Sequence, residues 1–241
     1  MQRIQDNYTL TSRASELDTQ SQDAVVERAF KVLMVGSHPE KTLGGISTVI
    51  NALLCSPTMA EFDIRFIGSQ ADDYGAFSKL ILAALSLVIF VFQILWWRPQ
   101  MAYIHVGSNA SLYRKVPFLA LARWLKLRVI AHFHAGDFTH YYSKQSGVGQ
   151  NLIRYGLGRS HRIIAVSRAS QDVLRELLPN AKVSYLPNGI DLSAFAGKKE
   201  KTDETVRLLF VGAMGKLKGE RDLIQAISTV AKDNRNLKVM L

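Results

Sequence analysis

Short, largely apolar runs alternate with longer helix-like stretches along most of this 241-residue chain. Uninterrupted apolar character, as in Lys31–Gly36, is typical of strands that are buried on both faces of a parallel sheet. Strands are predicted at Lys31–Gly36, Ile64–Gly68, Met101–Val106, Leu127–Phe133 and Arg162–Val166, and helices at Ile46–Leu54, 78–97, 111–125, 147–158 and 168–178. The alternation predicts an α/β fold with a doubly wound parallel sheet, in which ligands bind beyond the carboxyl ends of the strands.

The pattern divides the chain into four segments. Residues 1–29 are polar and are predicted to form a flexible tail, and residues 30–193 contain the Rossmann-like sheet. Residues 194–205 are charged and rich in small side chains, which predicts a linker. Residues 206–241 begin a second α/β unit and stop within its second strand, so we expect an incomplete domain with little stability of its own.

An uncharged stretch, Leu80–Trp97, lies between Lys79 and Arg98 and is close to the length that crosses a bilayer as a helix. A helix that spans the membrane would place Met101–Val106 on the opposite side from the first strand, although both should belong to one sheet. The sequence therefore favours a helix packed on the sheet, with Trp96 reaching the lipid interface together with the tryptophan that follows it, over a true span.

The composition, 48% hydrophobic and 21% charged residues, is that of a globular protein. A single cysteine, Cys55, cannot form an internal disulfide, and the polar N-terminus lacks a secretory leader, so the cytoplasm is the expected location. The net charge of +10 implies attraction to anions such as nucleic acid, acidic lipid headgroups or a phosphorylated substrate. No zinc-finger spacing or RNA-binding motif occurs, so we expect no nucleic-acid partner.

Basic residues gather in two regions of the predicted sheet domain. They form either an ordinary solvated face or a surface that faces an anionic membrane, where each charge contributes about 1 kcal/mol of attraction. The residues concerned are Arg114, Lys115, Arg123, Lys126 and Arg128, followed by Arg154, Arg159, Arg162 and Arg168.

The first candidate for chemistry is the segment GSHPEKTLGG at residues 36–45, between a predicted strand and a predicted helix. It matches neither the dinucleotide fingerprint G-x-G-x-x-G nor the phosphate loop G-x-x-x-x-G-K-[ST]. Gly44 and Gly45 carry no side chain, so backbone N–H groups at the start of the helix can approach a phosphate, aided by the helix dipole. A plain turn is the alternative.

The second candidate is HFHAGD at residues 132–137, at the end of a predicted strand. His132 and His134 are separated by one residue, so along a strand they would point to opposite faces. We therefore expect that they do not bind one metal ion together.

Several of these segments occur in a fixed order that resembles glycosyltransferase family 4. The segments are KVLMVG with Gly44-Gly45, HFHAGD, IIAVS at 163–167, LPNGID at 186–191 and LLFVGAMGKLKG at 208–219. The resemblance spans about residues 30–241 and implies the GT-B fold, in which two Rossmann-like domains face each other. Residues 30–193 would then be the acceptor-side domain, and residues 206–241 would be an incomplete donor-binding domain.

The resemblance also implies roles for residues of the first domain. Gly44 and Gly45 would contact the diphosphate of a nucleotide-sugar donor, and His134 would lie over the reacting sugar. Retaining members keep the anomeric configuration without an assured enzyme nucleophile, so the implied role of His134 is positioning and hydrogen bonding. Asp137 would either contact the acceptor or simply form a turn.

In the second domain, the implied donor site contains Gly212, Lys216 and Lys218. Lys218 matches a family lysine that neutralises the leaving nucleoside diphosphate, so no metal or other cofactor is expected. The family usually has an arginine where this chain has Ala213, and Lys216 would have to substitute for it. Solvated loop charges are the alternative for both lysines.

The resemblance implies transfer of a hexose from a nucleotide sugar to a saccharide or lipid-linked acceptor, with retention, in polysaccharide or glycolipid synthesis. The implied location is peripheral, on the inner face of the membrane. The acidic Glu-x7-Glu segment of the family's second domain does not occur in this chain, so we expect the chain alone to have little or no activity. A noncatalytic partner subunit or a decayed enzyme fragment is the alternative interpretation.

Overall fold

A computed structural model describes residues 29–42, 44–70, 76–107, 110–136, 138–190, 205–212, 219–232 and 236–240. The chain divides into two compact units, Met1–Ile190 and Asp191–Leu241, and each is described here by itself. The predicted N-terminal tail lies almost wholly outside the described residues, and so does the predicted linker.

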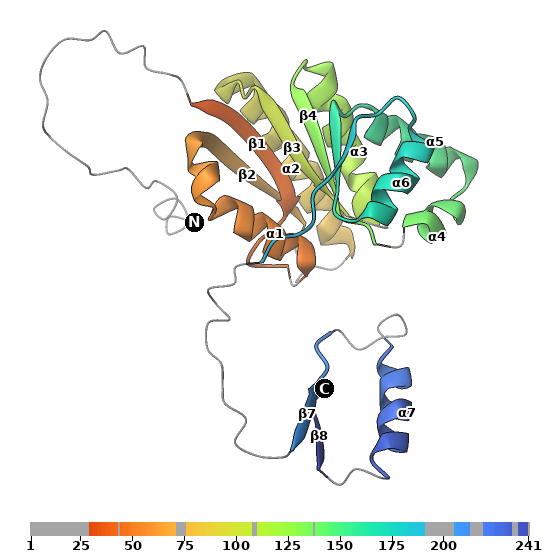
Figure 1. Ribbon diagram of the computed structural model, residues 1–241. Coiled ribbons are helices and arrows are strands. Elements are labelled where there is room, and N and C mark those ends of the chain that lie inside the picture. Colours follow the sequence, from red (N-terminus) through yellow and green to blue (C-terminus); the bar gives the residue numbers. More distant parts are fainter. Residues whose placement is uncertain are drawn as a thin grey trace, which may run out of the picture. The chain divides into compact units, whose positions relative to one another are not determined.

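The first unit is built on one six-stranded sheet in which all the paired strands are parallel (Figure 1). The strands are β1 (Phe30–Ser37), β2 (Phe62–Gln70), β3 (Met101–Val106), β4 (Arg128–Phe133), β5 (Arg162–Ala165) and β6 (Val183–Tyr185), in the spatial order β2-β1-β3-β4-β5-β6. Strand β2 lies on one side of β1, and β3 and the later strands lie on its other side, so the strand order reverses between β1 and β3. The carboxyl ends of these two strands are therefore the expected place for a ligand.

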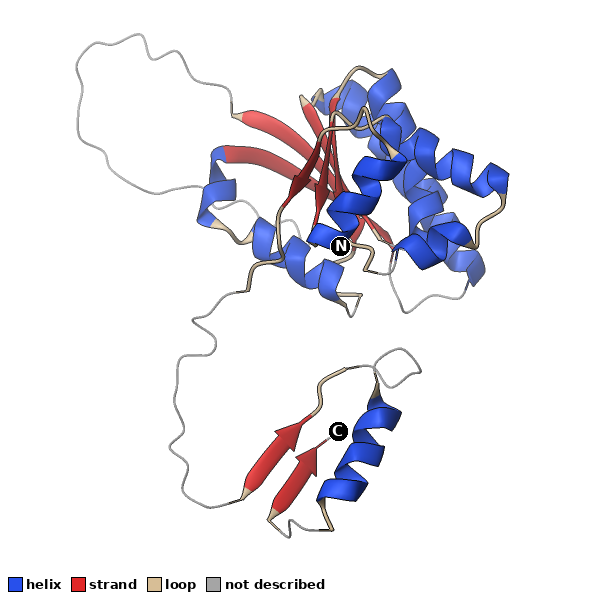
Figure 2. Cartoon of the chain, turned by 45° about the vertical axis from the view of Figure 1, so that its right-hand side comes forward, coloured by secondary structure: helices blue, strands red, loops and turns tan. Residues whose placement is uncertain are grey.

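Helices connect the strands and lie on both sides of the sheet (Figure 2). They are α1 (Gly45–Leu54), the 3-10 helix η2 (Pro57–Glu61), α2 (Ala76–Trp97), α3 (Ala110–Trp124), α4 (Phe138–Ser143), α5 (Gly147–Gly158) and α6 (Arg168–Leu177). The predicted α/β fold with a doubly wound parallel sheet is thereby confirmed.

Alternate residues of β1 supply the two halves of the core, because successive side chains of a strand point to opposite faces. Val32 and Met34 pack with Ile50 of α1 on one face. Leu33 and Val35 belong to the larger cluster on the other face, which also contains buried residues of α2, α3 and α5. Residues of the central strands are thus buried from both sides, which explains their uninterrupted apolar character.

Helix α2 packs against this larger cluster. Its side chains Phe90, Ile94 and Trp97 are at most 7% exposed, and the Phe90 ring meets the Phe118 ring of α3 edge-on at 5.2 Å. The prediction of a helix packed on the sheet is therefore correct. Among the described residues, no helix is long and apolar enough to cross a membrane.

Three short elements were not predicted from the sequence, namely η2, α4 and β6. Each has three to six residues, which is too short for an apolar period to be recognised. Strand β6 depends on its neighbour, since it pairs with β5 from Ile163↔Val183 to Ala165↔Tyr185.

The second unit contains β7 (Val206–Leu209), α7 (Glu220–Val230) and β8 (Leu237–Met240). The two strands are parallel, with Val206 opposite Leu237. None of its described residues is buried, and large apolar side chains such as Val211 and Leu209 are 84% and 64% exposed. The described part of this unit therefore has no closed hydrophobic core.

The packing of α2 can be tested with a pair of phenylalanines on the same helix. We expect Phe90→Ala to lower the free energy of unfolding of the first unit by about 3–5 kcal/mol, because Phe90 is fully buried. Phe92 is 57% exposed, so Phe92→Ala is the matched control and should cost less than about 1 kcal/mol. Urea unfolding of both variants measures the difference, and equal losses would show that α2 does not pack as described.

Candidate functional site

Three histidines gather at the carboxyl edge of the first unit's sheet. His105 in β3 and His132 in β4 are register partners in the parallel ladder, so they lie side by side. His134 follows the last residue of β4, and its ring lies 4.1 Å from the His132 ring and 5.3 Å from the His105 ring. Strand β3 borders the point where the strand order reverses, so the cluster lies where a ligand is expected.

The expectation that His132 and His134 point away from each other is wrong. Strand β4 ends at Phe133, so His134 is no longer bound by the alternation of a regular strand, and its ring turns towards that of His132. The backbone N–H of His134 donates to the carbonyl of Val106 at 2.8 Å, which holds the segment against the end of β3.

Two hydrogen bonds fix the orientation of the three rings. His105 Nδ1 and His134 Nε2 are 3.0 Å apart, and Tyr103 Oη and His132 Nδ1 are also 3.0 Å apart. The Nε2 atoms of His105 and His132 are buried and have no hydrogen-bond partner among the described residues. A buried polar atom without a partner is costly, so these two nitrogens are candidates for binding water, an ion or a substrate group.

The histidines are neutral at physiological pH. Burial lowers the pKa of His132 to about 4, and burial followed by the charge of His132 lowers the pKa of His134 to about 3. Burial also lowers the pKa of His105 well below its usual value, with further contributions from His132, His134 and Lys115. Neutral imidazoles can donate and accept hydrogen bonds, but they cannot supply a proton readily at pH 7.

A buried lysine lies near the same edge. Lys115 of α3 is 2% exposed, and its ammonium group donates to the Ser69 hydroxyl, which in turn donates to the Gly36 carbonyl at 3.1 Å. Burial, followed by the neighbouring charge of Arg114, lowers the pKa of Lys115 to about 7. Lys115 therefore changes charge near neutral pH and connects the ends of β1 and β2 with α3.

The interpretation of Lys115 as part of a solvated or membrane-facing basic surface is wrong, because the side chain is buried. Neighbouring Arg114 is only partly buried, and its guanidinium donates to Gln70 Oε1 at 2.8 Å. The sequence shows an Arg-Lys pair in a helix, but only packing decides which of the two turns inward.

The predicted phosphate-binding glycines lie at the same edge of the sheet. Gly44 and Gly45 are exposed, and an added Cβ at either would meet nothing within 4 Å. Gly44 is the N-cap residue of α1 and has no side chain that could cap the helix, so among the described residues no side-chain cap competes with a ligand for the first N–H groups. The first turn of α1 is close to the end of β3, since a Cβ at Gly107 would lie 3.1 Å from Ile46 Cδ1.

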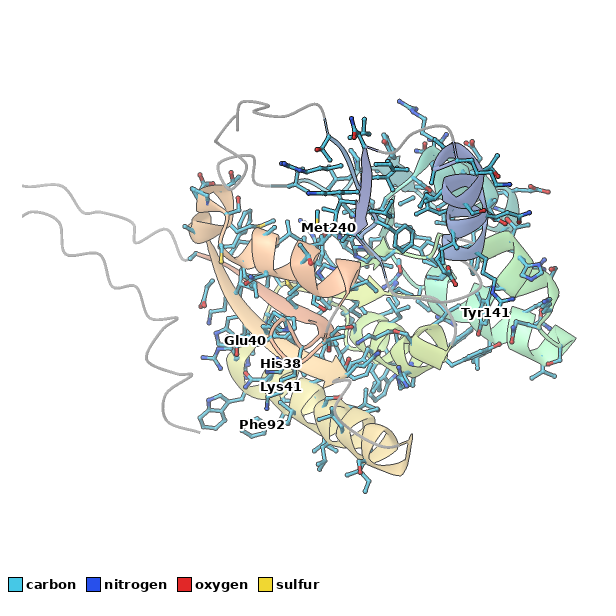
Figure 3. All side chains as sticks on the ribbon, turned by 90° about the horizontal axis from the view of Figure 1, so that it is seen from below. His38, Glu40, Lys41, Phe92, Tyr141 and Met240 are labelled. Atoms are coloured by element: carbon cyan, nitrogen blue, oxygen red, sulfur yellow. The ribbon has the colours of Figure 1, made fainter. Side chains whose placement is uncertain are left out.

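The loop between β1 and α1 is held by its own hydrogen bonds. His38 Nδ1 accepts from the backbone N–H groups of Glu40 and Lys41 at 3.2 and 3.3 Å, and the three residues lie close together (Figure 3). The Thr42 hydroxyl donates to the Gln70 carbonyl at 3.2 Å. The loop that presents the glycine pair is therefore anchored to the end of β2.

The structure thus brings Gly44, Gly45 and His134 to one edge of the sheet. Asp137, Lys216 and Lys218 lie outside the described residues, and Gly212 is exposed in the second unit. Their predicted roles remain predictions.

Sequence reasoning gave no role to His105 and Tyr103. The usable signal was the position of His105 one residue before the end of β3, which matches the position of His132 in β4. The match is informative only when the register between β3 and β4 is known, and the register could not be predicted from the sequence.

The three histidines are also the one group among the described residues that could hold a metal ion, with ligand nitrogens all within 4.8 Å of one another. Three neutral imidazoles suit Zn²⁺ and similar metals, whereas Mg²⁺ and Mn²⁺ prefer oxygen ligands. The expectation that no metal takes part stays a prediction.

The suppressed pKa values predict how stability depends on pH. Unfolded histidine binds a proton below about pH 6.5, whereas folded His132 does so only near pH 4, so the unfolded state binds more protons between these values. Stability should therefore fall as the pH falls from 7.5 to 5, by about 1.4 kcal/mol per pH unit for each such histidine once the pH is below 6.5.

The variant His132→Asn should show a shallower pH dependence in urea unfolding than the native chain. His140 is exposed and lies outside the cluster, so His140→Asn is the matched control for the loss of one imidazole. If His132→Asn does not fold, NMR titration of the imidazole resonances of the native chain tests the same prediction. Titration of His132 near pH 6.5 would contradict the buried cluster.

The comparisons with known proteins agree with this architecture. The family model for glycosyltransferase family 4 matches residues 73–194, a little more than half of the chain. No curated protein matches the sequence.

Among solved structures, sucrose-phosphate synthase from Thermosynechococcus elongatus matches with a TM-score of 0.62 and 11% identity, over 87% of this chain and 70% of that one. A UDP-N-acetylglucosamine 2-epimerase matches with a TM-score of 0.51 and 13% identity, over 88% of this chain and 63% of the other. S. aureus MnaA, solved with UDP, matches with a TM-score of 0.51 and 13% identity, over 87% of this chain and 60% of that one. The chain thus spans between three fifths and seven tenths of these proteins, and identities this low establish the fold alone. The family match establishes more: the chain belongs to glycosyltransferase family 4.

Proposed function

We propose that this protein transfers a hexose from a nucleotide sugar to a saccharide or lipid-linked acceptor with retention of configuration, in the synthesis of a polysaccharide or glycolipid. The observation that carries the proposal is the histidine cluster beside the glycine pair, at the sheet edge of a family 4 domain. Glycosyl transfer needs two things at such a site, a phosphate contact and a polar group over the sugar.

The glycine pair would supply the phosphate contact. Uncapped N–H groups at the start of α1 carry the partial positive charge of the helix dipole, and the absence of side chains at Gly44 and Gly45 allows close approach. Each good N–H contact to a developing negative charge contributes several kcal/mol in a site that excludes water.

His134 would position the reacting sugar. It is neutral, and its Nε2 is engaged with His105, so the ring is held in one orientation. A fixed neutral imidazole can hydrogen-bond a sugar hydroxyl without abstracting a proton, which lowers the entropic cost of reaching the transition state. His105 is then a positioning residue that acts through His134.

Residues of the second unit would complete the donor site. Gly212, Lys216 and Lys218 are proposed to contact the nucleoside diphosphate, with Lys218 neutralising the charge that develops on it. The UDP in one structural relative supports a nucleotide donor. Asp137, after the histidine cluster, is proposed to contact the acceptor.

We further propose that the enzyme acts on the inner face of the membrane as a peripheral protein. A lipid-linked acceptor would be presented there, and the net charge of +10 favours anionic surfaces. The alternative, a noncatalytic partner subunit or a decayed enzyme fragment, would bind its ligands without turning them over.

Turnover tests the proposal. The native protein is purified from its source cell and assayed with a panel of nucleotide hexoses and membrane lipid extract. We expect a glycosylated product, and NMR should show that its anomeric configuration is the same as that of the donor. His134→Ala should lower kcat/KM by about 100-fold or more, because it removes a group aimed at the reacting sugar. The exposed His140→Ala is the matched control and should retain activity.

Loss of activity in both variants would contradict the specific role given to His134, and inversion of configuration would contradict the proposed retention. Binding of a nucleotide sugar without any turnover would favour the noncatalytic alternative.

Removal of metal ions tests the proposed charge neutralisation by lysine. If Lys218 neutralises the leaving diphosphate, EDTA should change kcat/KM by less than about twofold, whereas Lys218→Ala should reduce it by about 100-fold or more. Restoration of EDTA-treated enzyme only by Mg²⁺ or Mn²⁺ would show that a metal ion has that role.

A further inference from the structure

Helix α2 presents a continuous apolar face to solvent, although its opposite face is buried. Its exposed large side chains are between 45% and 76% accessible, and Trp96 is the most exposed. At 3.6 residues per turn they fall within an arc of about 120°, so they form one stripe along the helix. This outer face of α2 consists of Ile81, Leu85, Val88, Ile89, Phe92, Leu95 and Trp96.

The inner face of α2 is fixed to the core. Phe90, Ile94 and Trp97 are buried, and Ser86 satisfies its hydroxyl by donating to the Ala83 carbonyl at 2.9 Å. Surrounding the whole helix with lipid would require removing these side chains from the sheet. The helix can therefore lie on an apolar medium with its outer face but cannot be immersed in it without unpacking the core.

Such a face is unusual for a surface in contact with water. Single exposed apolar residues are common on soluble domains, but a contiguous group of this size marks a contact surface. Phe92 lies on the outer side of α2, away from the sheet, and its ring stacks on that of Trp96 at 6.1 Å (Figure 3). Tryptophan is enriched where protein meets the interface between lipid headgroups and acyl chains, because its ring is apolar and its N–H is polar.

The charges around the helix identify the kind of surface. No acidic residue occurs in the sequence 76–98, and Arg98 is exposed directly after the helix. Arg65 of β2 is exposed, with its guanidinium 2.8 Å from Gln93 Oε1 and 4.5 Å from the centre of the Trp97 ring. Lys31 donates to the Trp97 carbonyl at 3.3 Å.

At the carboxyl end of α2, Asp63 lies opposite Lys31 in the β1–β2 ladder and Glu61 stands two residues before it, so three cations face two acidic residues there. Asp72 and Asp73 precede the other end of the helix in the sequence, so the cationic end is the carboxyl end. Each basic residue close to an anionic leaflet contributes about 1 kcal/mol of attraction. An apolar stripe with cations at one end matches the chemistry of an anionic phospholipid surface, whose headgroups are negative and whose interior is apolar.

We propose that the outer face of α2 is the membrane-docking surface, and that the helix lies in the plane of an anionic phospholipid bilayer with Trp96 at headgroup depth. The inference deepens the peripheral location in the proposed function. It is tested by binding alone, so its failure would leave the transferase proposal standing.

The test uses the full 241-residue chain and sedimentation with vesicles. With vesicles of about 30% phosphatidylglycerol in phosphatidylcholine we expect binding, and with phosphatidylcholine alone we expect at least about tenfold weaker binding, because the cationic contribution is lost. The variant Phe92→Ser/Trp96→Ser should bind the anionic vesicles roughly 10- to 100-fold more weakly, since it removes two large apolar groups from the lipid contact.

A matched pair of valines controls for a general loss of apolar surface. Val88 on the outer face of α2 is 67% exposed, and Val148 on α5 is 79% exposed. Val88→Ser should weaken vesicle binding several-fold, whereas Val148→Ser should leave it unchanged. All of these side chains are exposed, so circular dichroism should show that each variant folds as the native chain does.

Equal binding by the native chain and the Phe92→Ser/Trp96→Ser variant would overturn the proposal. So would a native chain that forms dimers which this variant abolishes without any vesicle binding, because the face would then be covered by a second copy. Tryptophan fluorescence gives an independent reading, since brominated lipid should quench the native chain and should quench a Trp96→Phe variant clearly less.

Discussion

The parallel pairing of β3 with β4 is the constraint on which the site depends. This ladder sets His105 opposite His132 and brings the residue after β4 against the end of β3. Alternate residues of both strands pack into different core clusters on the two faces of the sheet, so a shift of one residue would move every side chain into the wrong cluster, and the register is strongly determined. The cluster of neutral imidazoles is therefore a consequence of core packing rather than of any local motif.

Burial then sets the chemistry of this edge. The same apolar surroundings that stabilise the sheet keep the histidines uncharged and lower the pKa of Lys115 to about 7. A site of neutral hydrogen-bonding groups beside uncapped helix N–H groups is suited to positioning a polar, phosphorylated ligand. It is less suited to proton transfer at neutral pH, and the positioning role expected for His134 stays a prediction.

Helix α2 packs one apolar face on the core and exposes another. Its residues are apolar all round, which in a single sequence is equally compatible with a buried core helix and with a helix in lipid. The sheet covers one face, and basic residues of β1 and β2 contact the carboxyl-terminal turn of the helix. The histidine cluster and the outer face of α2 thus belong to the same compact unit.

The sequence by itself determined the longer strands and helices of the first unit in their order, the α/β class and the family, and it singled out Gly44, Gly45 and His134 as candidates. These features depend on short-range patterns, namely apolar runs, helical spacing and residues at the ends of elements. It did not determine that His105, His132 and His134 meet, that Lys115 turns inward while Arg114 does not, or which face of α2 is exposed. Those features depend on strand register and on packing between segments that are far apart in the chain, and only the tertiary structure decides them.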